Sequence, residues 1–354
     1  MISHYPLTSL YLYLTDACNL SCSHCWISPR LSKQLQSGIP FEPLTAIIHE
    51  AKLLGLQSVK LTGGEPLLYR EIKELLVFLS SENLAIYIET NGTLLDSEMI
   101  TLLEQAAVTQ ISVSLDSAKE KIHDAIRGVR GGFQQTLKGL RLLSETGLNF
   151  QIIMTLQRKN SREIPTVIDL CRSLKVGSLK INHLLPCGRG AEAYRRGENL
   201  TLEELRALYR QVMEISKKNQ DLEVDFDIPL AFRSIQDITH RGICECEILN
   251  ILGILADGEY SICGIGKTVP ELRMGNILND SIRDTWRHHP VLSDLRRSLP
   301  EKLRGICKNC IFKFQCLGGC RASAYAMEKD LYAPYFLCQA LYDANQFPSS
   351  RYIG

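Results

Sequence analysis

The stretch LYLYLTDACNLSCSHC, residues 10–25, joins an apolar run to three closely spaced cysteines. Its first part, residues 10–14, has the apolar and aromatic composition of a buried strand. Similar runs recur along the chain, and helix-period sequence follows each of them. They lie at residues 58–62, 84–88, 111–115, 150–156 and 178–182. Because strands that alternate with helices form parallel sheets, these six units predict an α/β fold, a partial, open (β/α)6 barrel of the TIM type rather than a closed one.

The pattern changes after the helical stretch at 201–218. From residue 240 onward the apolar spacing becomes irregular, and eight of the thirteen cysteines lie there. Small loop-rich modules rarely bury enough apolar surface to fold unaided, so cross-links or bound metal would have to order this segment. We therefore expect a barrel at 8–220, a linker at 221–239, a cysteine-rich domain at 240–342 and a C-terminal tail at 343–354.

Composition narrows the class of protein. The chain has 354 residues, 45% of them hydrophobic, and 40 basic against 39 acidic residues give a net charge of +1. This balance provides no general attraction to nucleic acid or to an anionic membrane. We see no signal peptide and no apolar run of about 18 residues that would span a membrane. A cytoplasmic location is expected, where clustered cysteines bind metal or catalyse more often than they form disulfides.

Cys18, Cys22 and Cys25 form the pattern C-x3-C-x2-C directly after the first predicted strand, at the end of a barrel strand where active sites lie. Three thiolates at this spacing suit three corners of a [4Fe-4S] cluster, and no fourth cysteine lies nearby in the sequence. One iron would then stay open to a substrate or cofactor. A zinc site with His24 as the fourth ligand is the alternative.

With His24 as the large ring before the last cysteine, this motif resembles the signature of the radical S-adenosylmethionine (SAM) superfamily. The resemblance implies that SAM chelates the open iron and that the reduced cluster cleaves it to a 5′-deoxyadenosyl radical. Further positions resemble the SAM pocket of the family, in the order that its fold requires. They are Gly63, Gly64, Glu65 and Pro66 of a GGEP motif, then Asn91, Ser114, Asp116, Arg127 and Leu185. In the GGEP motif, the backbone and Glu65 would bind the amino group of the methionine part of SAM. Glycine allows a ligand to approach the backbone this closely because it has no Cβ.

The C-terminal cysteines resemble the SPASM extension of peptide- and protein-modifying radical SAM enzymes, which carries two auxiliary [4Fe-4S] clusters. The resemblance implies that Cys263 and Cys320, with Cys244 and/or Cys246, hold the first auxiliary cluster. If either Cys244 or Cys246 does not bind iron, the first auxiliary cluster keeps an open iron site. The second cluster would be held by Cys307, Cys310, Cys316 and Cys338. Zinc ribbons are the alternative, because closed zinc sites also use C-x2-C pairs.

Two cysteines lie outside these clusters. Cys171 falls on the apolar face of a predicted helix, so we expect a core position. Cys187 lies in LPCGRG, residues 185–190, after the sixth predicted strand and so at the barrel mouth. Cys187 is either a hydrogen-atom donor or substrate contact, or an inert thiol.

The resemblance implies an enzyme that abstracts hydrogen from a ribosomally made peptide or protein and cross-links, epimerises or splices it. The compact size and the segment CSHCWISP, residues 22–29, look like those of maturases of Nif11-type leader peptides, including peptide spliceases. Sulfatase maturation is disfavoured, because Gly264 stands where those relatives place an Asp base. The alternatives are a haem-biosynthetic decarboxylase or oxidase, and an iron-sulfur electron carrier or redox sensor.

The expected cofactors are SAM and three [4Fe-4S] clusters. The expected partners are a precursor peptide and a reductant of the flavodoxin or ferredoxin type. Many peptide maturases carry an N-terminal winged-helix segment, whereas the first barrel strand is expected here near residue 10. A separate small protein, or the barrel itself, would then recognise the leader peptide. We expect neither nucleic acid nor a membrane as a partner.

Overall fold

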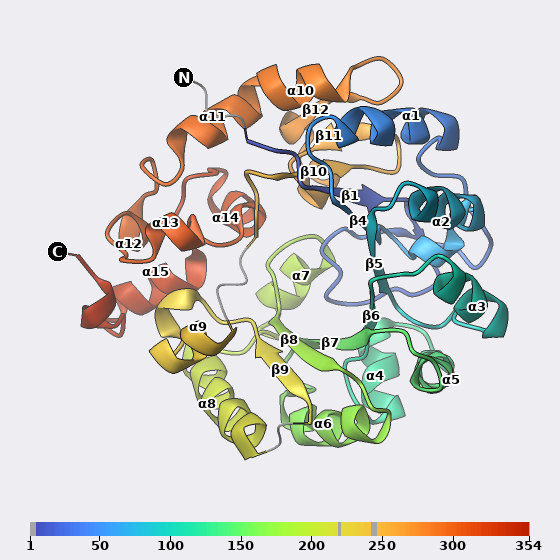
Figure 1. Ribbon diagram of the computed structural model, residues 1–354. Coiled ribbons are helices and arrows are strands. Elements are labelled where there is room, and N and C mark those ends of the chain that lie inside the picture. Colours follow the sequence, from blue (N-terminus) through green and yellow to red (C-terminus); the bar gives the residue numbers. More distant parts are fainter. Residues whose placement is uncertain (1–4, 219–220, 242–245, 354) are drawn as a thin grey trace.

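The computed structural model describes residues 5–218, 221–241 and 246–353. Its strands are β1 (Ser9–Tyr13), β2 (Ala17–Cys18), β3 (Arg30–Leu31), β4 (Ser58–Thr62), β5 (Ala85–Thr90), β6 (Gln110–Ser114), β7 (Phe150–Leu156), β8 (Ser178–His183), β9 (Glu223–Phe226), β10 (Ile251–Ile254), β11 (Glu259–Ser261) and β12 (Arg273–Asn276). In the described chain, all but β2 and β3 form one ten-stranded sheet in the order β12-β11-β10-β1-β4-β5-β6-β7-β8-β9. In the part of this order that runs from β10 through β1 to β9, each strand is parallel to its neighbours. The sheet curls into an open barrel (Figure 1).

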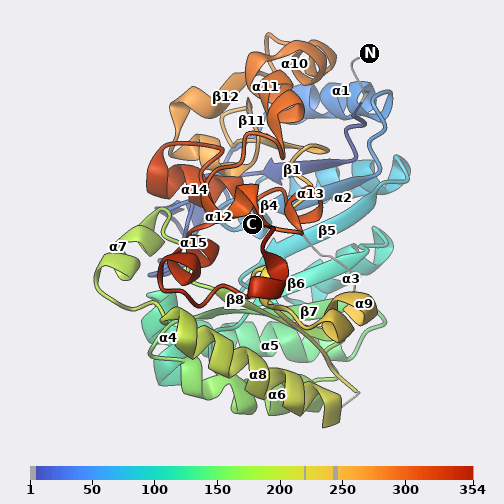
Figure 2. The same ribbon diagram turned by 90° about the vertical axis from the view of Figure 1, so that its left-hand side faces the viewer.

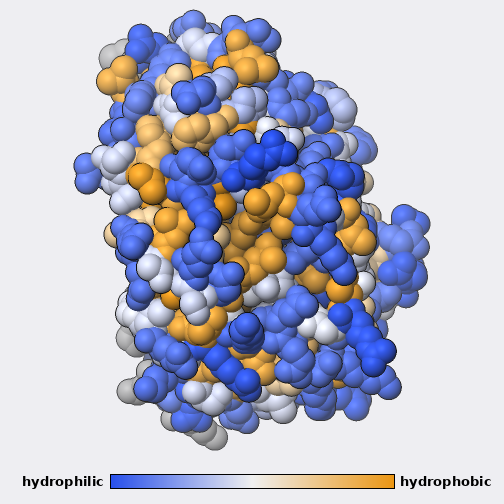
Figure 3. All heavy atoms as spheres, turned by 90° about the vertical axis from the view of Figure 1, so that its right-hand side faces the viewer, coloured by the Kyte–Doolittle hydropathy of each residue, from blue (hydrophilic) through white to orange (hydrophobic). Residues whose placement is uncertain are grey.

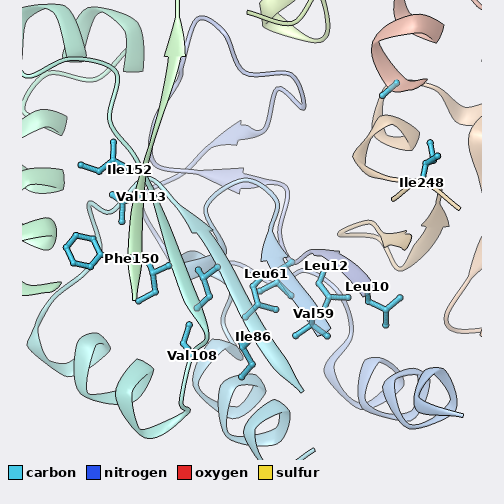
Figure 4. Packing of buried hydrophobic residues seen from close by; sticks show 14 of the residues in the cluster. Leu10, Leu12, Val59, Leu61, Ile86, Val108, Val113, Phe150, Ile152 and Ile248 are labelled. Carbon is cyan, nitrogen blue, oxygen red and sulfur yellow. The ribbon is translucent and has the colours of Figure 1, made fainter. Parts of the chain in front are cut away.

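Helices pack against the outer face of this sheet and close the core. These helices are α1 (Phe41–Lys52), α2 (Ile72–Ser81), α3 (Ser97–Gln105), α4 (Glu120–Arg127), α5 (Gly132–Ser144), α6 (Ile164–Ser173) and α8 (Leu202–Lys218), whereas α7 (Arg189–Arg195) lies inside the ring that they form (Figure 1). Alternate side chains of a strand face opposite sides of the sheet. Val59 and Leu61 therefore lie fully buried in the core, together with Leu10, Leu12 and Ile86 (Figure 4).

The other side chains of the same strands line the inside of the barrel, which we call the lumen. Most of these are polar and half-buried, and they include Tyr11, Lys60, Thr62, Tyr87, Glu89, Gln110, Ser114, Gln151, Thr155, Lys180, Asn182 and Asp225. Lys60 forms an ion pair with Glu89 at 3.1 Å and lies 4.6 Å from the ring centroid of Tyr11. The amide of Gln151 donates to Ser112 Oγ at 2.7 Å. The lumen therefore offers hydrogen-bonding groups from strands all around the sheet.

The C-terminal region packs across the start of the barrel sheet. It contains α10 (Ile282–His288), α11 (Pro290–Ser298), α12 (Gly305–Lys308), α13 (Lys313–Cys316), α14 (Arg321–Glu328) and α15 (Phe336–Asp343), whereas α9 (Ile235–Arg241) precedes it and packs on α8 near β9 (Figure 1). Strand β10 pairs with β1, and Ser281 Oγ donates to Glu50 Oε1 of α1 at 2.6 Å. Trp286 Nε1 donates to the carbonyl of Tyr5 at 2.9 Å. Figure 2 shows this region lying beside the barrel as one continuous structure with it.

The predicted fold class is confirmed, and two predicted strands, 58–62 and 150–156, coincide with β4 and β7. The segment at 221–239 differs from a simple linker, because it contains β9, which pairs with β8 and extends the parallel sheet. Its sequence, EVDF, carries two acidic residues that strands disfavour, so tertiary pairing decides its structure. The described part of the predicted tail, up to residue 353, packs on the preceding domain, since Ile311 N donates to the carbonyl of Arg351 at 3.1 Å.

Within the described residues, no helix combines the length and the apolar character needed to cross a membrane. Figure 3 shows the face formed by the outer barrel helices, where hydrophilic side chains surround an apolar area. Leu53 and Val77, at the end of α1 and on α2, are among the exposed apolar residues of the molecule.

Candidate functional site

The loop that carries Cys18, Cys22 and Cys25 follows β1 and is tied to the end of α4. Ser21 N donates to the carbonyl of Arg127 at 2.9 Å, and Ser23 N donates to that of Ile126 at 2.9 Å. This approach requires glycine at position 128, whose φ is +74° and whose added Cβ would lie 2.3 Å from the carbonyl oxygen of Ser21. The three predicted ligands therefore sit on a loop whose position the barrel fixes.

The surroundings of these thiols fit a thiolate-bound cluster. Cys18 and Cys22 are buried, and burial raises the pKa of Cys18 to about 12, so an unbound thiolate there would be costly. Hydrogen-bond donors nevertheless point at both sulfurs: Leu20 N and Asn91 Nδ2 at Cys18 Sγ, 3.4 and 3.8 Å away, and Arg127 at Cys22 Sγ, 3.7 Å away. Donors of this kind stabilise metal-bound thiolates.

Gly63 and Gly64 lie where β4 meets the cluster loop. Gly63 has φ +126°, and an added Cβ at Gly64 would lie 1.9 Å from the carbonyl oxygen of Ala17. Gly64 N donates to the carbonyl of Thr15 at 2.8 Å, and Glu65 N to that of Ala17 at 2.8 Å. We expected these glycines to admit a ligand. The structure shows that they also let two backbone segments pack beside the predicted cluster.

Glu65 is the acidic residue of the motif and is 1% exposed. Its carboxylate accepts hydrogen bonds from Thr90 Oγ1 at 2.6 Å, Asn91 N at 2.9 Å and Leu67 N at 3.2 Å. Burial raises the pKa of Glu65 to about 7 despite these donors. Pro66, the last residue of the motif, begins the 3-10 helix Pro66–Leu68. A cationic ligand such as an amino group would stabilise the ionised form of this carboxylate.

Asn91 joins two of these parts. The side-chain Nδ2 of Asn91 donates to Asn19 Oδ1 at 2.8 Å, beside Cys18. The backbone carbonyl of Asn91 accepts a hydrogen bond from Thr136 Oγ1 of α5 at 2.9 Å. The predicted residues Cys18, Glu65 and Asn91 therefore form one connected polar network at the ends of β4 and β5.

A second network lies at the end of β6. Asp116 is fully buried, and its Oδ2 lies 2.8 Å from Arg127 Nε and 3.8 Å from His24 Nδ1. Burial acts to raise the pKa of Asp116, but Arg127 and His24 outweigh it, so the pKa lies below its ordinary value. Arg127, predicted to face the SAM carboxylate, thus already has an anionic partner. Ser114 precedes this network in β6 and is half-buried on the lumen side.

Sequence reasoning missed the role of Arg189. Its Nε donates to the carbonyl of Cys22 at 2.8 Å, and its backbone N donates to the carbonyl of Cys25 at 2.9 Å. The neighbouring Gly188 approaches the cluster loop so closely that an added Cβ would lie 2.3 Å from the carbonyl oxygen of Trp26. Residues 188–190 therefore hold the cluster loop from the opposite side of the barrel mouth. Leu185 lies just before them and is half-buried.

The four cysteines predicted to hold the second auxiliary cluster line one pocket. Cys307, Cys310, Cys316 and Cys338 all line this pocket, and its other lining residues are mostly apolar. Tyr335 N donates to Cys307 Sγ at 3.3 Å. Among the residues described, no three His, Cys, Asp or Glu side chains converge closely enough to hold a single metal ion.

Of the cysteines predicted to hold the first auxiliary cluster, Cys263 and Cys320 are half-buried and Cys246 is exposed. Burial raises the pKa of Cys263, and the charges that Cys320, Cys246 and Cys187 would carry as thiolates raise it further. Cys244, the other predicted ligand, lies outside the described residues. Cys187, expected to be a hydrogen-atom donor or substrate contact or else an inert thiol, is buried in the turn after β8.

Gly264, next to Cys263, has no room for a side chain. An added Cβ would lie 2.5 Å from the ring of Tyr13 and 2.7 Å from the ring of Trp26. These two rings pack edge to face with centroids 6.2 Å apart. An aspartate base, which sulfatase maturation would need at this position, does not fit.

Comparison with known proteins agrees with this geometry. Residues 12–171 match the model of the radical SAM superfamily, and residues 244–311 match the SPASM iron-sulfur cluster-binding domain. The chain is 30% identical over 335 residues to an AdoMet-dependent heme synthase of Methanosarcina barkeri (strain Fusaro / DSM 804), covering 90% of this chain and 92% of that relative.

It is also 30% identical over 316 residues to the sporulation killing factor maturation protein SkfB of Bacillus subtilis (strain 168), covering 89% of this chain and 70% of SkfB. Among solved structures, SuiB of Streptococcus suis bound to the precursor peptide SuiA resembles this chain with a TM-score of 0.75 at 21% identity, over 95% of this chain and 76% of SuiB. The two matched domains imply a SAM-binding [4Fe-4S] cluster and auxiliary iron-sulfur clusters in this protein.

Proposed function

Since this chain belongs to the radical SAM superfamily and carries a SPASM domain, we propose that it modifies a ribosomally made peptide or protein by hydrogen abstraction. When bound, SAM and the reduced cluster supply a 5′-deoxyadenosyl radical. We assign the cluster to Cys18, Cys22 and Cys25, and the amino group of SAM to Glu65. Arg189 and Gly128 position the loop that carries the cluster.

The polar lumen is the observation that carries the choice of a peptide. Its half-buried hydroxyl and amide groups match the repeated donors and acceptors of a peptide backbone. A tetrapyrrole, by contrast, presents several carboxylates and calls for a surplus of basic residues. The charged strand residues on this face are Lys60 and Lys180 against Glu89, Glu223 and Asp225, which gives no surplus of positive charge.

Two relatives add support for a peptide substrate. SkfB is named as a maturation protein, and SuiB has been crystallised with its precursor peptide. If this chain also acts on a precursor peptide, the finer outcome, whether cross-link, epimer or spliced backbone, depends on how that peptide lies in the lumen. A separate leader-binding protein and a flavodoxin- or ferredoxin-type reductant complete the proposed set of partners.

A haem-type reaction is the second candidate, because the AdoMet-dependent heme synthase of Methanosarcina barkeri matches over 92% of its length. The two candidates make opposite predictions about substrate. Reconstituted, reduced enzyme with SAM is offered either iron coproporphyrin III or the products of short reading frames beside its gene. We expect a peptide to gain or lose mass and to stimulate 5′-deoxyadenosine formation. Decarboxylation of the porphyrin, with no change in any peptide, would overturn the proposal.

The variant with Cys18, Cys22 and Cys25 all replaced by alanine is the matched control. It should lose modification of either substrate while keeping its auxiliary clusters. Product that persists in this variant would show that the modification does not depend on the radical cluster.

A further inference from the structure

Arg321 begins α14, directly after Cys320, and is only 1% exposed. Backbone carbonyls hold its guanidinium: Nη1 donates to Ala333 at 2.7 Å and to Leu331 at 3.0 Å, and Nε donates to Gly319 at 3.3 Å. The buried Nη2 has no hydrogen-bond partner among the described residues. Because an arginine side chain stays protonated in proteins, a full positive charge lies inside the C-terminal domain.

The charge of Arg321 is not balanced by a carboxylate. In the part of the chain that the structure describes, Arg321 bonds to carbonyl oxygens and forms no ion pair. Asp330, which precedes Leu331 in the sequence, pairs with Arg304 instead. Carbonyl oxygens carry only partial charges, and a buried cation without an anion is costly. The three bonds therefore fix the guanidinium in place, but its surroundings still call for an anion.

The guanidinium lies behind the wall of the pocket that the second auxiliary cysteines line. Gly318 is part of this wall, and an added Cβ there would lie 2.5 Å from Nη2 of Arg321. Tyr335 is also part of it, and Tyr335 N donates to Cys307 Sγ at 3.3 Å. Ala333, whose carbonyl binds Arg321, is only two residues before Tyr335. The segments that hold the guanidinium thus form two sides of the pocket.

We propose that Arg321 is the counter-charge of the second auxiliary cluster and makes that cluster easier to reduce. A cluster bound by four thiolates is a net anion, and an electron that it accepts makes it more negative. A fixed cation beside the cluster therefore stabilises the reduced form more than the oxidised form. Arg321 acts through its charge and is not a ligand. The proposal rests on the assignment of this pocket to a cluster and does not depend on the substrate.

The alternative role of Arg321 is that of a clamp, which joins residues 317–319 to residues 331–333 through the carbonyl bonds alone. A clamp affects the stability of the domain, whereas a counter-charge changes the reduction potential of the cluster. Two substitutions separate these roles. Arg321→Gln keeps amide donors for the carbonyls and removes the charge, whereas Arg321→Lys keeps the charge and loses the planar guanidinium.

The test uses the full-length chain with one cluster left. Alanine replaces five cysteines of the other two predicted clusters, namely Cys18, Cys22, Cys25, Cys246 and Cys263. The protein is titrated anaerobically with dithionite at controlled potential, and the EPR signal of the reduced cluster gives its midpoint potential. Arg321→Gln should lower the equilibrium constant for reduction about tenfold, which corresponds to about 59 mV for a one-electron couple. Arg321→Lys should change this constant less than about threefold.

Arg297→Gln is the matched control, because Arg297 is exposed on α11 and its Nε also donates to a backbone carbonyl, that of Ser293 at 3.2 Å. Water screens an exposed charge, so this variant should keep the potential of the five-alanine protein. If Arg321→Gln binds no cluster while Arg321→Lys binds one with an unshifted potential, the site needs the charge, and the proposal stands.

Three results for the Arg321 variants would overturn the proposal. They are an unshifted potential in Arg321→Gln, equal shifts in Arg321→Gln and Arg321→Lys, and loss of the cluster from both variants. A five-alanine protein that binds no cluster would overturn the assignment of the pocket itself, and the proposal with it. None of these readouts involves SAM or a substrate, so failure of the proposed peptide activity would leave them unaffected.

Discussion

The two cysteine-rich ends of this molecule are built in different ways. Around Cys18, the ends of β4, β5 and β6 supply two networks of buried polar groups, in which Glu65 bonds to Asn91 and Asp116 pairs with Arg127, beside the cluster loop. Around Cys307, the pocket is mostly apolar, and the neighbouring helices α12 and α13 have only four residues each. The difference teaches that the sheet holds the first site in place, whereas the second depends on its cluster for order.

The largest effect should come from removing the second auxiliary cluster. Cys310→Ala with Cys338→Ala should lower the free energy of unfolding by several kcal/mol, because metal binding to a site built from short helices and loops contributes directly to folding. Anaerobic urea unfolding, with limited proteolysis of the C-terminal region, measures this.

The matched comparison is the triple alanine variant of Cys18, Cys22 and Cys25. It should keep roughly two thirds of the iron of a chain that binds three clusters, and most of its stability. Equal destabilisation by the two sets of substitutions would remove the contrast between the sites.

The next effect concerns Glu65. Glu65→Gln should weaken SAM binding roughly ten- to hundred-fold, the equivalent of the about 1.5–3 kcal/mol that a hydrogen bond to a charged group contributes. Calorimetric titration with SAM under anaerobic conditions measures the change, with surface Glu82→Gln as control. Unchanged affinity with an intact first cluster would remove Glu65 from the SAM site.

The same carboxylate gives a dependence on pH. Burial raises the pKa of Glu65 from 4.5 to about 7. The folded protein therefore holds this proton more tightly than the unfolded chain, and this group alone makes stability fall as the pH rises from 4.5 to 7. SAM affinity should change in the opposite direction and weaken as the pH falls below 7, because a protonated Glu65 cannot attract an ammonium group. Glu65→Gln should flatten this profile.

A smaller effect is expected in the lumen. Glu89→Gln leaves Lys60 without its 3.1 Å partner, and should lower turnover of the substrate about tenfold, or ~1.4 kcal/mol, with substrate-free SAM cleavage unchanged. The double variant Lys60→Met with Glu89→Gln should recover part of the loss, since no charge is left unpaired. A fall in substrate-free cleavage would mean that the pair supports the SAM site instead.

The smallest effect is expected at Arg189. Arg189→Lys removes the donor to the carbonyl of Cys22 and should cost about 1 kcal/mol, seen as faster loss of iron from the first cluster to a chelator. Arg195→Lys, at the exposed end of the same helix, is the control. Equal rates for the two variants would show that Arg189 does not hold the loop.

The sequence alone predicts the parts of this fold that local patterns determine. Strands such as β4 and β7 alternate apolar residues or contain long apolar runs, so their bounds follow from composition. Spacing likewise identifies Cys18, Cys22 and Cys25, because the ligands are neighbours in the chain. The grouping of Cys307, Cys310, Cys316 and Cys338 follows from the resemblance to the SPASM extension, and the structure places these four around one pocket.

Contacts between distant segments could not be predicted in this way. Strand β9 is short and acidic, and forms because β8 offers an unpaired edge. The run PCGRG, residues 186–190, can be read in the sequence, but only the folded chain shows that Arg189 donates a hydrogen bond to the carbonyl of Cys22 across the barrel mouth.

One measurement tests most directly whether the barrel end is a radical SAM site. The reconstituted, dithionite-reduced protein is incubated with SAM under strict anaerobiosis, and 5′-deoxyadenosine is quantified. We expect 5′-deoxyadenosine to form, and to be absent from the triple alanine variant of Cys18, Cys22 and Cys25. A protein with all its clusters that neither binds SAM nor forms 5′-deoxyadenosine would contradict this assignment and favour an electron carrier.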